Sequence, residues 1–181
     1  MLPRLALEVI YLLDANTLID AKRDYFEFER VPEFWEWLQH HGGIGNVKVP
    51  VEIYEEFEEP KNAEGGRDSL AEWASGEEVK RALLLGEDVD QRIVSRVISQ
   101  GYCQNPTDQE IEKMGRDPFL IAHALRDPGS RVVVTTEVSK PKKQRANRQV
   151  PDVCSDMGVR CINTFQFLRA LDFKTGWKKF M

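Results

Sequence analysis

The sequence contains few cysteines and no long hydrophobic run. Its three cysteines cannot all pair within one chain, and none of their spacings resembles a CxxC zinc motif. We therefore expect reduced thiols and a cytoplasmic protein. The most apolar early segment, residues 9–13, lies between two acidic residues and is too short for a secretion signal or a membrane span. We expect no association with a membrane.

Basic residues are outnumbered as well. The 25 Lys and Arg against 30 Asp and Glu give a net charge of −5, so the overall charge cannot attract a polyanion such as nucleic acid. Hydrophobic residues, at 41%, and aromatic residues, at 9%, are frequent enough to form a core, which excludes global disorder. The length of 181 residues indicates a single domain spanning residues 1–181.

Short apolar segments rich in β-branched residues alternate with helical patterns along the chain. Strands are predicted at residues 8–13, 46–50, 131–136 and 159–163. Helices are predicted at residues 16–23, 32–41, 51–59, 69–100 with breaks at Gly76 and Gly86, 117–125 and 164–171. This alternation predicts an α/β fold, a three-layer α/β/α arrangement with a central parallel sheet of four to five strands. In such folds the functional site lies at the carboxyl ends of the strands.

Acidic residues gather where the predicted strands end. They are Asp14 after the first strand, Glu52, Glu55 and Glu56 in the helix after the second, Asp117 at the start of the helix before the third, and Glu137 after the third. Two unpaired carboxylates about 4 Å apart repel by roughly 4 kcal/mol at an effective dielectric constant of about 20. A cluster is therefore costly unless it binds a cation, and oxygen-only ligands favour Mg²⁺ or Mn²⁺ over zinc.

Each carboxylate also has a purely structural explanation. Asp14 and Asp117 could cap the helices that follow them, and the glutamates of residues 52–59 could form a solvated helix face. Glu137 alone could be an ordinary loop residue. The argument for a site depends on position, because four separate segments bring carboxylates to the same edge of one sheet.

A basic segment follows Glu137 directly. Residues 139–150 contain five cations and no acidic residue. These cations are Lys140, Lys142, Lys143, Arg145 and Arg148. A phosphate backbone that approaches an acidic metal site needs positive charge nearby to offset its repulsion by the carboxylates, so we expect these residues to bind nucleic acid. The alternative is a flexible, solvated loop.

Four motifs in order resemble the PIN-domain superfamily of metal-dependent ribonucleases. They are YLLDANTLI at 11–19, VP at 49–50 followed by Glu56, RDPFLIAHA at 116–124, and VVTTE at 133–137. The resemblance covers residues 9–171 and is closest to toxin-like and uncharacterised prokaryotic members. It implies a PIN-like fold with a helical insertion at about 67–115.

The resemblance implies a role for individual residues. Glu56 matches the helix glutamate of the family because it stands six residues after Pro50, whereas Glu52 and Glu55 are less favoured substitutes. Glu137 stands where the family more often has Asp. The implied catalytic and metal-binding residues are Asp14, Glu56, Asp117 and Glu137, supported by Asn16 and Thr135.

The function implied by the resemblance is a Mg²⁺- or Mn²⁺-dependent endoribonuclease that leaves 5′-phosphate and 3′-hydroxyl ends. The same resemblance implies a toxin with an antitoxin protein as partner, and a homodimer. One alternative is a haloacid-dehalogenase-like phosphatase, because DANT at 14–17 approximates its Asp-x-Asp-x-Thr motif. However, the amide of Asn16 cannot act as the proton donor of that chemistry. The other alternative is a non-catalytic PIN-like RNA-binding or scaffold domain.

Overall fold

The chain folds around one parallel sheet. The structure is a computed structural model that describes residues 9–59, 65–66 and 68–181, so residue 8 of the first predicted strand and residue 67 of the predicted insertion lie outside it. The strands in the described ranges are β1 (Ile10–Leu13), β2 (Val47–Lys48), β3 (Arg131–Val134) and β4 (Arg160–Ile162). Their order is β2-β1-β3-β4, and every pair is parallel. The predicted α/β fold with a central parallel sheet is confirmed.

Helices connect the strands and cover the sheet. The α-helices of the described residues are α1 (Ala15–Asp20), α2 (Pro32–Gly43), α3 (Val51–Glu58), α4 (Ser69–Ala74), α5 (Glu77–Leu83), α6 (Gln91–Arg96), α7 (Asp108–Met114), α8 (Asp117–Leu125), α9 (Val150–Met157) and α10 (Thr164–Ala170). Short π- or 3₁₀-helical turns are η1 (Ala21–Tyr25), η2 (Val97–Tyr102), η3 (Arg145–Asn147) and η4 (Trp177–Phe180).

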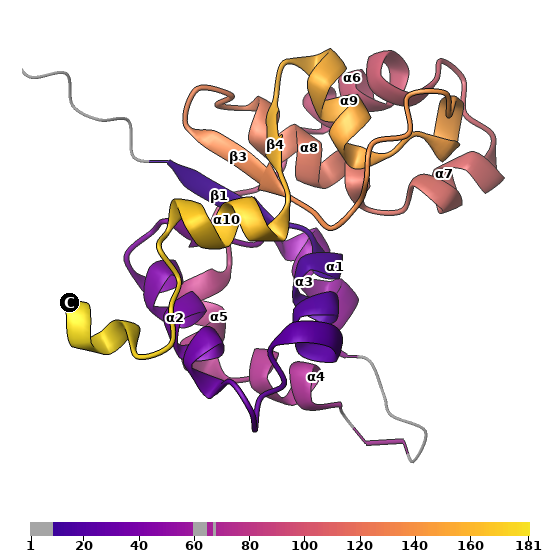
Figure 1. Ribbon diagram of the computed structural model, residues 1–181. Helices are drawn as coiled ribbons and strands as arrows, with labels where there is room; N and C mark the ends of the chain where they lie inside the picture. Colours follow the sequence, from indigo (N-terminus) through magenta and orange to yellow (C-terminus); the bar gives the residue numbers. More distant parts are fainter. Residues whose placement is uncertain (1–8, 60–64, 67) are drawn as a thin grey trace, which may run out of the picture.

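The sheet lies between two groups of helices, as a three-layer fold requires. Figure 1 shows α6, α7, α8 and α9 on one side of the sheet and α2, α5 and α10 on the other. On the second side, the Phe167 ring of α10 packs against Tyr11 of β1 at 5.4 Å and against Trp37 of α2 at 5.5 Å. Residues 11–13 of β1 and 132–134 of β3 are buried between these layers, which explains why the two central strands are almost continuously hydrophobic.

Three details differ from the sequence-based expectation. Helix α2 extends two residues beyond its predicted end at residue 41, and Gly42 in this extension packs against the backbone of α5: a Cβ there would lie 2.9 Å from the carbonyl oxygen of Ala82. Helix α9 lies in a segment for which no helix was predicted, and α7 lies within the predicted helical insertion but beyond the helical pattern of residues 69–100. The capping box of Thr107 and Glu110 is the sequence signal that marks α7.

The predicted insertion adds to the edge of the sheet. Its helices are α4, α5, α6 and α7, with breaks at Gly76 and Gly86 as predicted. After α5, Leu84 forms a parallel bridge with Val49, the residue that follows β2. The N–H of Val49 donates to the Leu83 carbonyl at 2.8 Å, and the N–H of Leu85 donates to the Val49 carbonyl at 2.9 Å. The insertion therefore satisfies the backbone of an edge strand.

Across the described ranges, every helix is too short or too polar to cross a membrane.

Candidate functional site

Asp14 lies where β1 ends and faces the neighbouring strand. Its backbone N–H donates to the Val134 carbonyl at 2.9 Å, and its carboxylate accepts a hydrogen bond of 2.7 Å from the Thr135 hydroxyl. Although Asp14 precedes α1, its side chain makes no hydrogen bond that caps this helix. Burial, with a contribution from the charge of Glu137, raises the pKa of Asp14 to about 6, although the Thr135 hydroxyl opposes this shift. The carboxylate is therefore anchored to the edge of the sheet by Thr135, and the backbone N–H groups of Asn16 and Ala15 at the start of α1 also lower its pKa without forming a helix cap.

Asp117 shows that the predicted carboxylates share one electrostatic environment. It is the first residue of α8, and the capping position before it is occupied by Arg116. Burial first, and then the negative charges of Asp14, Glu137 and Glu56, raise the pKa of Asp117 to about 8. The charges of all three other predicted ligands therefore act on Asp117, as expected if four segments converge at the carboxyl ends of the strands.

The three glutamates of α3 are distinguished by their neighbours. Glu52 Oε2 lies 3.2 Å from the buried Nε2 of His123, and Glu55 forms an ion pair of 2.5 Å with Arg116. Glu56, an exposed residue, has no such partner within the described residues: partial burial and the charge of Asp14 raise its pKa, and the charge of Arg116 opposes the shift. These contacts favour Glu56 as the member of α3 that joins the cluster.

Glu137 is held in place by the start of α9. Its Oε2 accepts the N–H of Val150, the first residue of that helix, at 2.7 Å. Its own backbone N–H donates to the Thr135 hydroxyl oxygen at 3.1 Å. Thr135 therefore contacts both Asp14 and Glu137, which agrees with a supporting role. Asn16, the other residue assigned such a role, is exposed in the first turn of α1.

The donor chemistry of the cluster suits a hard divalent cation. Within the described residues, no three His, Cys, Asp or Glu side chains form a group that could hold a metal ion directly. Mg²⁺ usually binds proteins through one or two carboxylates and keeps several of its waters, so it does not need three direct ligands. Carboxylates that raise one another's pKa values would be stabilised by such a charge. The predicted residues Asp14, Glu56, Asp117 and Glu137 supply the carboxylate oxygens that such a cation prefers, without forming a group of three direct ligands.

Two of the predicted acidic residues and the basic segment meet in one pocket. Asp117 and Glu137 line a hollow of about 330 Å³ together with Lys140, Lys143 and Arg148. Lys113 of α7 and the segment 146–149 complete its wall. Asp117 and Glu137 therefore lie beside the cations of the basic segment, and this segment contains the short helical turn η3 and ends where α9 begins.

Two arginines of the basic segment are paired with carboxylates. The Nε of Arg145 lies 2.5 Å from Glu110 Oε1, and a guanidinium nitrogen of Arg148 lies 2.5 Å from Asp156. The bond from Arg145 lowers the pKa of Glu110 to about 2. These ion pairs tie the segment to α7 and α9, so their main contribution is to order it.

Three lysines of the same segment remain available for a ligand. The side chains of Lys140, Lys142 and Lys143 form no ion pair with any residue in the described ranges. The backbone N–H of Lys140 donates to Asp152 at 2.7 Å, which fixes where this lysine leaves the surface. The free cations of the segment are thus displayed from an ordered backbone.

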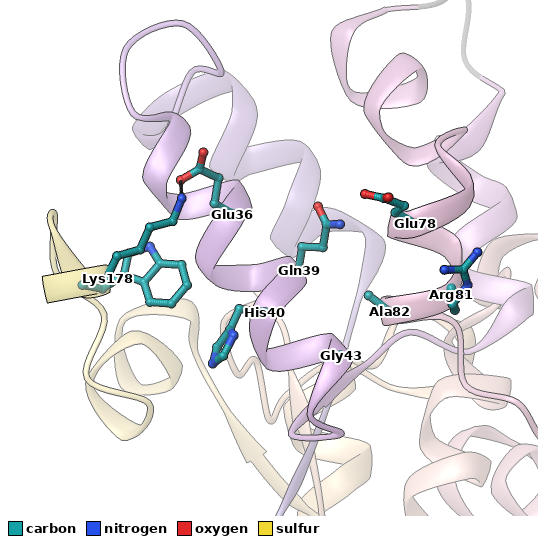
Figure 2. A pocket seen from close by; sticks show the side chains of 9 residues that line it. Glu36, Gln39, His40, Gly43, Glu78, Arg81, Ala82 and Lys178 are labelled. Atoms are coloured by element: carbon teal, nitrogen blue, oxygen red, sulfur yellow. Dashed lines mark ion pairs between the residues drawn. The ribbon is translucent and has the colours of Figure 1, made fainter. Parts of the chain in front are cut away.

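A separate hollow of about 500 Å³ lies between α2, α5 and the C-terminal segment. Figure 2 shows Gln39 and His40 of α2 facing this hollow, with an ion pair of 2.8 Å between Glu36 and Lys178 beside it. None of the predicted site residues lines it. It is therefore distinct from the acidic edge of the sheet.

Comparison with known proteins identifies one family. No curated protein and no solved structure matches the chain. A family described as a domain of unknown function (DUF4411) matches residues 11–175, a span that contains all four carboxylates and the basic segment. Because this match extends over most of the length of the chain, the chain belongs to the DUF4411 family.

Proposed function

We propose that this protein is a metal-dependent endoribonuclease that hydrolyses RNA phosphodiester bonds. The observation that carries the proposal is the shared pocket, in which Asp117 and Glu137 face Lys140, Lys143 and Arg148. A phosphodiester needs cations for its charge, and its hydrolysis needs an activated water beside it. The resemblance of the four motifs to the PIN superfamily supports the same reaction.

Asp14, Glu56, Asp117 and Glu137 would hold the Mg²⁺ or Mn²⁺. When bound, the cation supplies a water of lowered pKa and neutralises charge that develops on the scissile phosphate. The chain itself orients the ligands: Thr135 holds one oxygen of Asp14, and the first N–H of α9 holds one oxygen of Glu137. Both restraints act on ligands that would otherwise repel each other.

The basic segment would bind the RNA backbone. In a chain of net charge −5, the unpaired Lys140, Lys142 and Lys143 form a local attraction for phosphates next to the acidic cluster. A strand that approaches is therefore attracted on one side of the cluster and repelled elsewhere. This asymmetry supports binding at one edge of the sheet.

The resemblance also supports a biological role, which we propose with the activity. The protein would act in the cytoplasm as the toxin of a toxin–antitoxin pair, bound by an antitoxin protein, and would form a homodimer. Expression of the toxin should arrest growth, and expression of Asp14→Asn should not. Growth arrest by both proteins would contradict a toxicity that depends on cleavage.

The decisive experiment is cleavage of a panel of structured and single-stranded RNAs in Mn²⁺ or in EDTA. Asp14→Asn should abolish cleavage, whereas Asp172→Asn should retain it. The second change is a matched control, because Asp172 is 84% exposed and has a positive φ of 50°, which Asn tolerates. Equal cleavage by Asp14→Asn and the unaltered protein would reject the proposal. Tight RNA binding without cleavage would instead indicate a binding domain.

A further inference from the structure

A second hollow at the edge of the sheet, of about 250 Å³, also has Glu137 in its wall. It is formed by the segment after β3 and by residues where β4 ends, among them Thr135, Ser139, Asn163 and Gln166. Glu137 lines both this hollow and the basic pocket. The two hollows therefore adjoin at Glu137, which places the second hollow next to a phosphate bound at the acidic cluster.

The chemistry of the two hollows differs. The basic pocket is lined by three lysines and one arginine, whereas the second hollow has no Lys, Arg or His in its wall. Apart from the carboxylate of Glu137, which it shares with the basic pocket, its polar groups are hydroxyls, amides and the thiol of Cys161, and Val138, Pro151 and Ile162 provide apolar surface. Such a wall offers nothing to neutralise a phosphate, but it suits an uncharged, flat group that presents hydrogen-bonding atoms at its edge.

The side chains of Asn163 and Gln166 are held by hydrogen bonds that use their oxygen atoms and not their NH₂ groups. Asn163 Oδ1 accepts the backbone N–H of Gln166 at 2.9 Å, and Gln166 Oε1 accepts the backbone N–H of Asn163 at 2.9 Å. Because this capping box engages both carbonyl oxygens, each side chain presents its NH₂ group to other partners. The wall therefore holds two restrained donors, and little further entropy is lost when they bind a ligand.

We propose that this hollow binds the nucleobase next to the scissile phosphate, and that Asn163 and Gln166 select a base edge with two adjacent acceptors. Guanine presents such an edge at O6 and N7, and cytosine presents one at O2 and N3. The inference rests on the proposed ribonuclease function, because the position of the base is defined by a phosphate at the acidic cluster.

Gln166→Glu tests this selection while it keeps the fold. Glu at this position provides the same capping oxygen, but it replaces the amide donor by an acceptor. Gln39→Glu is the matched control, because it makes the same chemical change in the separate hollow of Figure 2. Asn163→Asp, which also keeps its capping oxygen, is a second variant should Gln166→Glu fail to fold.

The probes are adenine-tract RNAs that carry one central guanine, cytosine, uracil or adenine. Their binding is measured in Ca²⁺ and their cleavage in Mn²⁺. The unaltered protein and Gln39→Glu should bind the guanine or the cytosine probe about tenfold more tightly than the adenine probe. In Gln166→Glu, most of this preference over the adenine probe should be lost. A uniform repulsion by the added charge weakens all four probes and leaves the ratio unchanged.

The outcomes separate the inference from the proposed function. Equal affinity for all four probes, a preference that survives in both Gln166→Glu and Asn163→Asp, or no binding at all would overturn the inference. Cleavage without base preference would leave the ribonuclease standing and reject the base site. Base preference in binding without cleavage of any probe would keep the base site and reject the ribonuclease.

Discussion

The Thr135 hydroxyl donates to the Asp14 carboxylate at 2.7 Å and so joins two residues that are 121 positions apart in the sequence. The parallel register explains the contact. Leu13 of β1 pairs with Val134 of β3, so the residues that follow them, Asp14 and Thr135, lie side by side. The same hydroxyl accepts the N–H of Glu137. One threonine thus orders two members of the acidic cluster.

Thr135→Val should impair this order at nearly constant volume. Loss of the donor should raise the pKa of Asp14 above its present value of about 6, because the hydroxyl now lowers it. We expect a loss of about 1–3 kcal/mol in the free energy of unfolding at neutral pH, since a buried acceptor loses its partner. Chemical denaturation checks this, with Thr136→Val as the control. Equal stability of the two variants would contradict the role of Thr135.

Asp117 should make the metal-free protein less stable as the pH rises. Its pKa is raised from 3.8 to about 8 on folding, so the folded protein holds this proton at pH values where the unfolded chain has released it. The free energy of unfolding therefore falls between pH of about 4 and about 8. Asp117→Asn should remove the share of this fall that Asp117 causes, leaving the share of Asp14 with its pKa of about 6, and should stabilise the protein at pH 8 in EDTA by on the order of a few kcal/mol. A pH profile identical to that of the unaltered protein would show that Asp117 ionises normally.

Divalent cations should restore the stability that the metal-free protein loses as the pH rises. Binding to the folded state alone raises stability in proportion to the logarithm of the ligand concentration, so Mg²⁺ or Mn²⁺ should raise the melting temperature at pH 8. Asp117→Asn should show a smaller increase, and Asp172→Asn should behave like the unaltered protein. A shift that is the same in all three proteins would place the cation elsewhere.

The three unpaired lysines should account for the salt dependence of RNA binding. Replacement of Lys140, Lys142 and Lys143 by Gln should make the slope of log K against log salt shallower, by about 0.7 for each phosphate of a single strand that is no longer neutralised. Lys179→Gln, at the C-terminal end, is the control. An unchanged slope in the triple variant would exclude the basic segment as the phosphate-binding surface.

Local signals were sufficient for the strands and for two of the carboxylates. β1 and β3 are short apolar runs, and Asp14 follows the first of them directly, so its position at the edge of the sheet could be predicted from the order of elements alone. Asp117 was placed correctly at the start of a helix, although as its first residue and not as its cap.

The rest of the site depends on contacts that no local pattern contains. Glu52 and Glu55 differ from Glu56 in having partners among the described residues. Glu52 contacts His123 and Glu55 pairs with Arg116, and both partners lie more than 60 residues away in the sequence. The tether on Glu137 requires α9, a helix of eight residues with a proline at its second position, which periodicity alone does not reveal. Tertiary partners, and not helix or strand propensity, decide which charged groups remain free.

The bridge between Val49 and Leu84 means that the insertion cannot be trimmed away to give a smaller stable core. Excision of the segment after α3 would strip both backbone hydrogen bonds from Val49. The exposed strand edge would then be a template for pairing with other chains. A shortened protein should consequently self-associate, whether or not it keeps its catalytic residues. Fragments made for expression screening should therefore keep this segment intact.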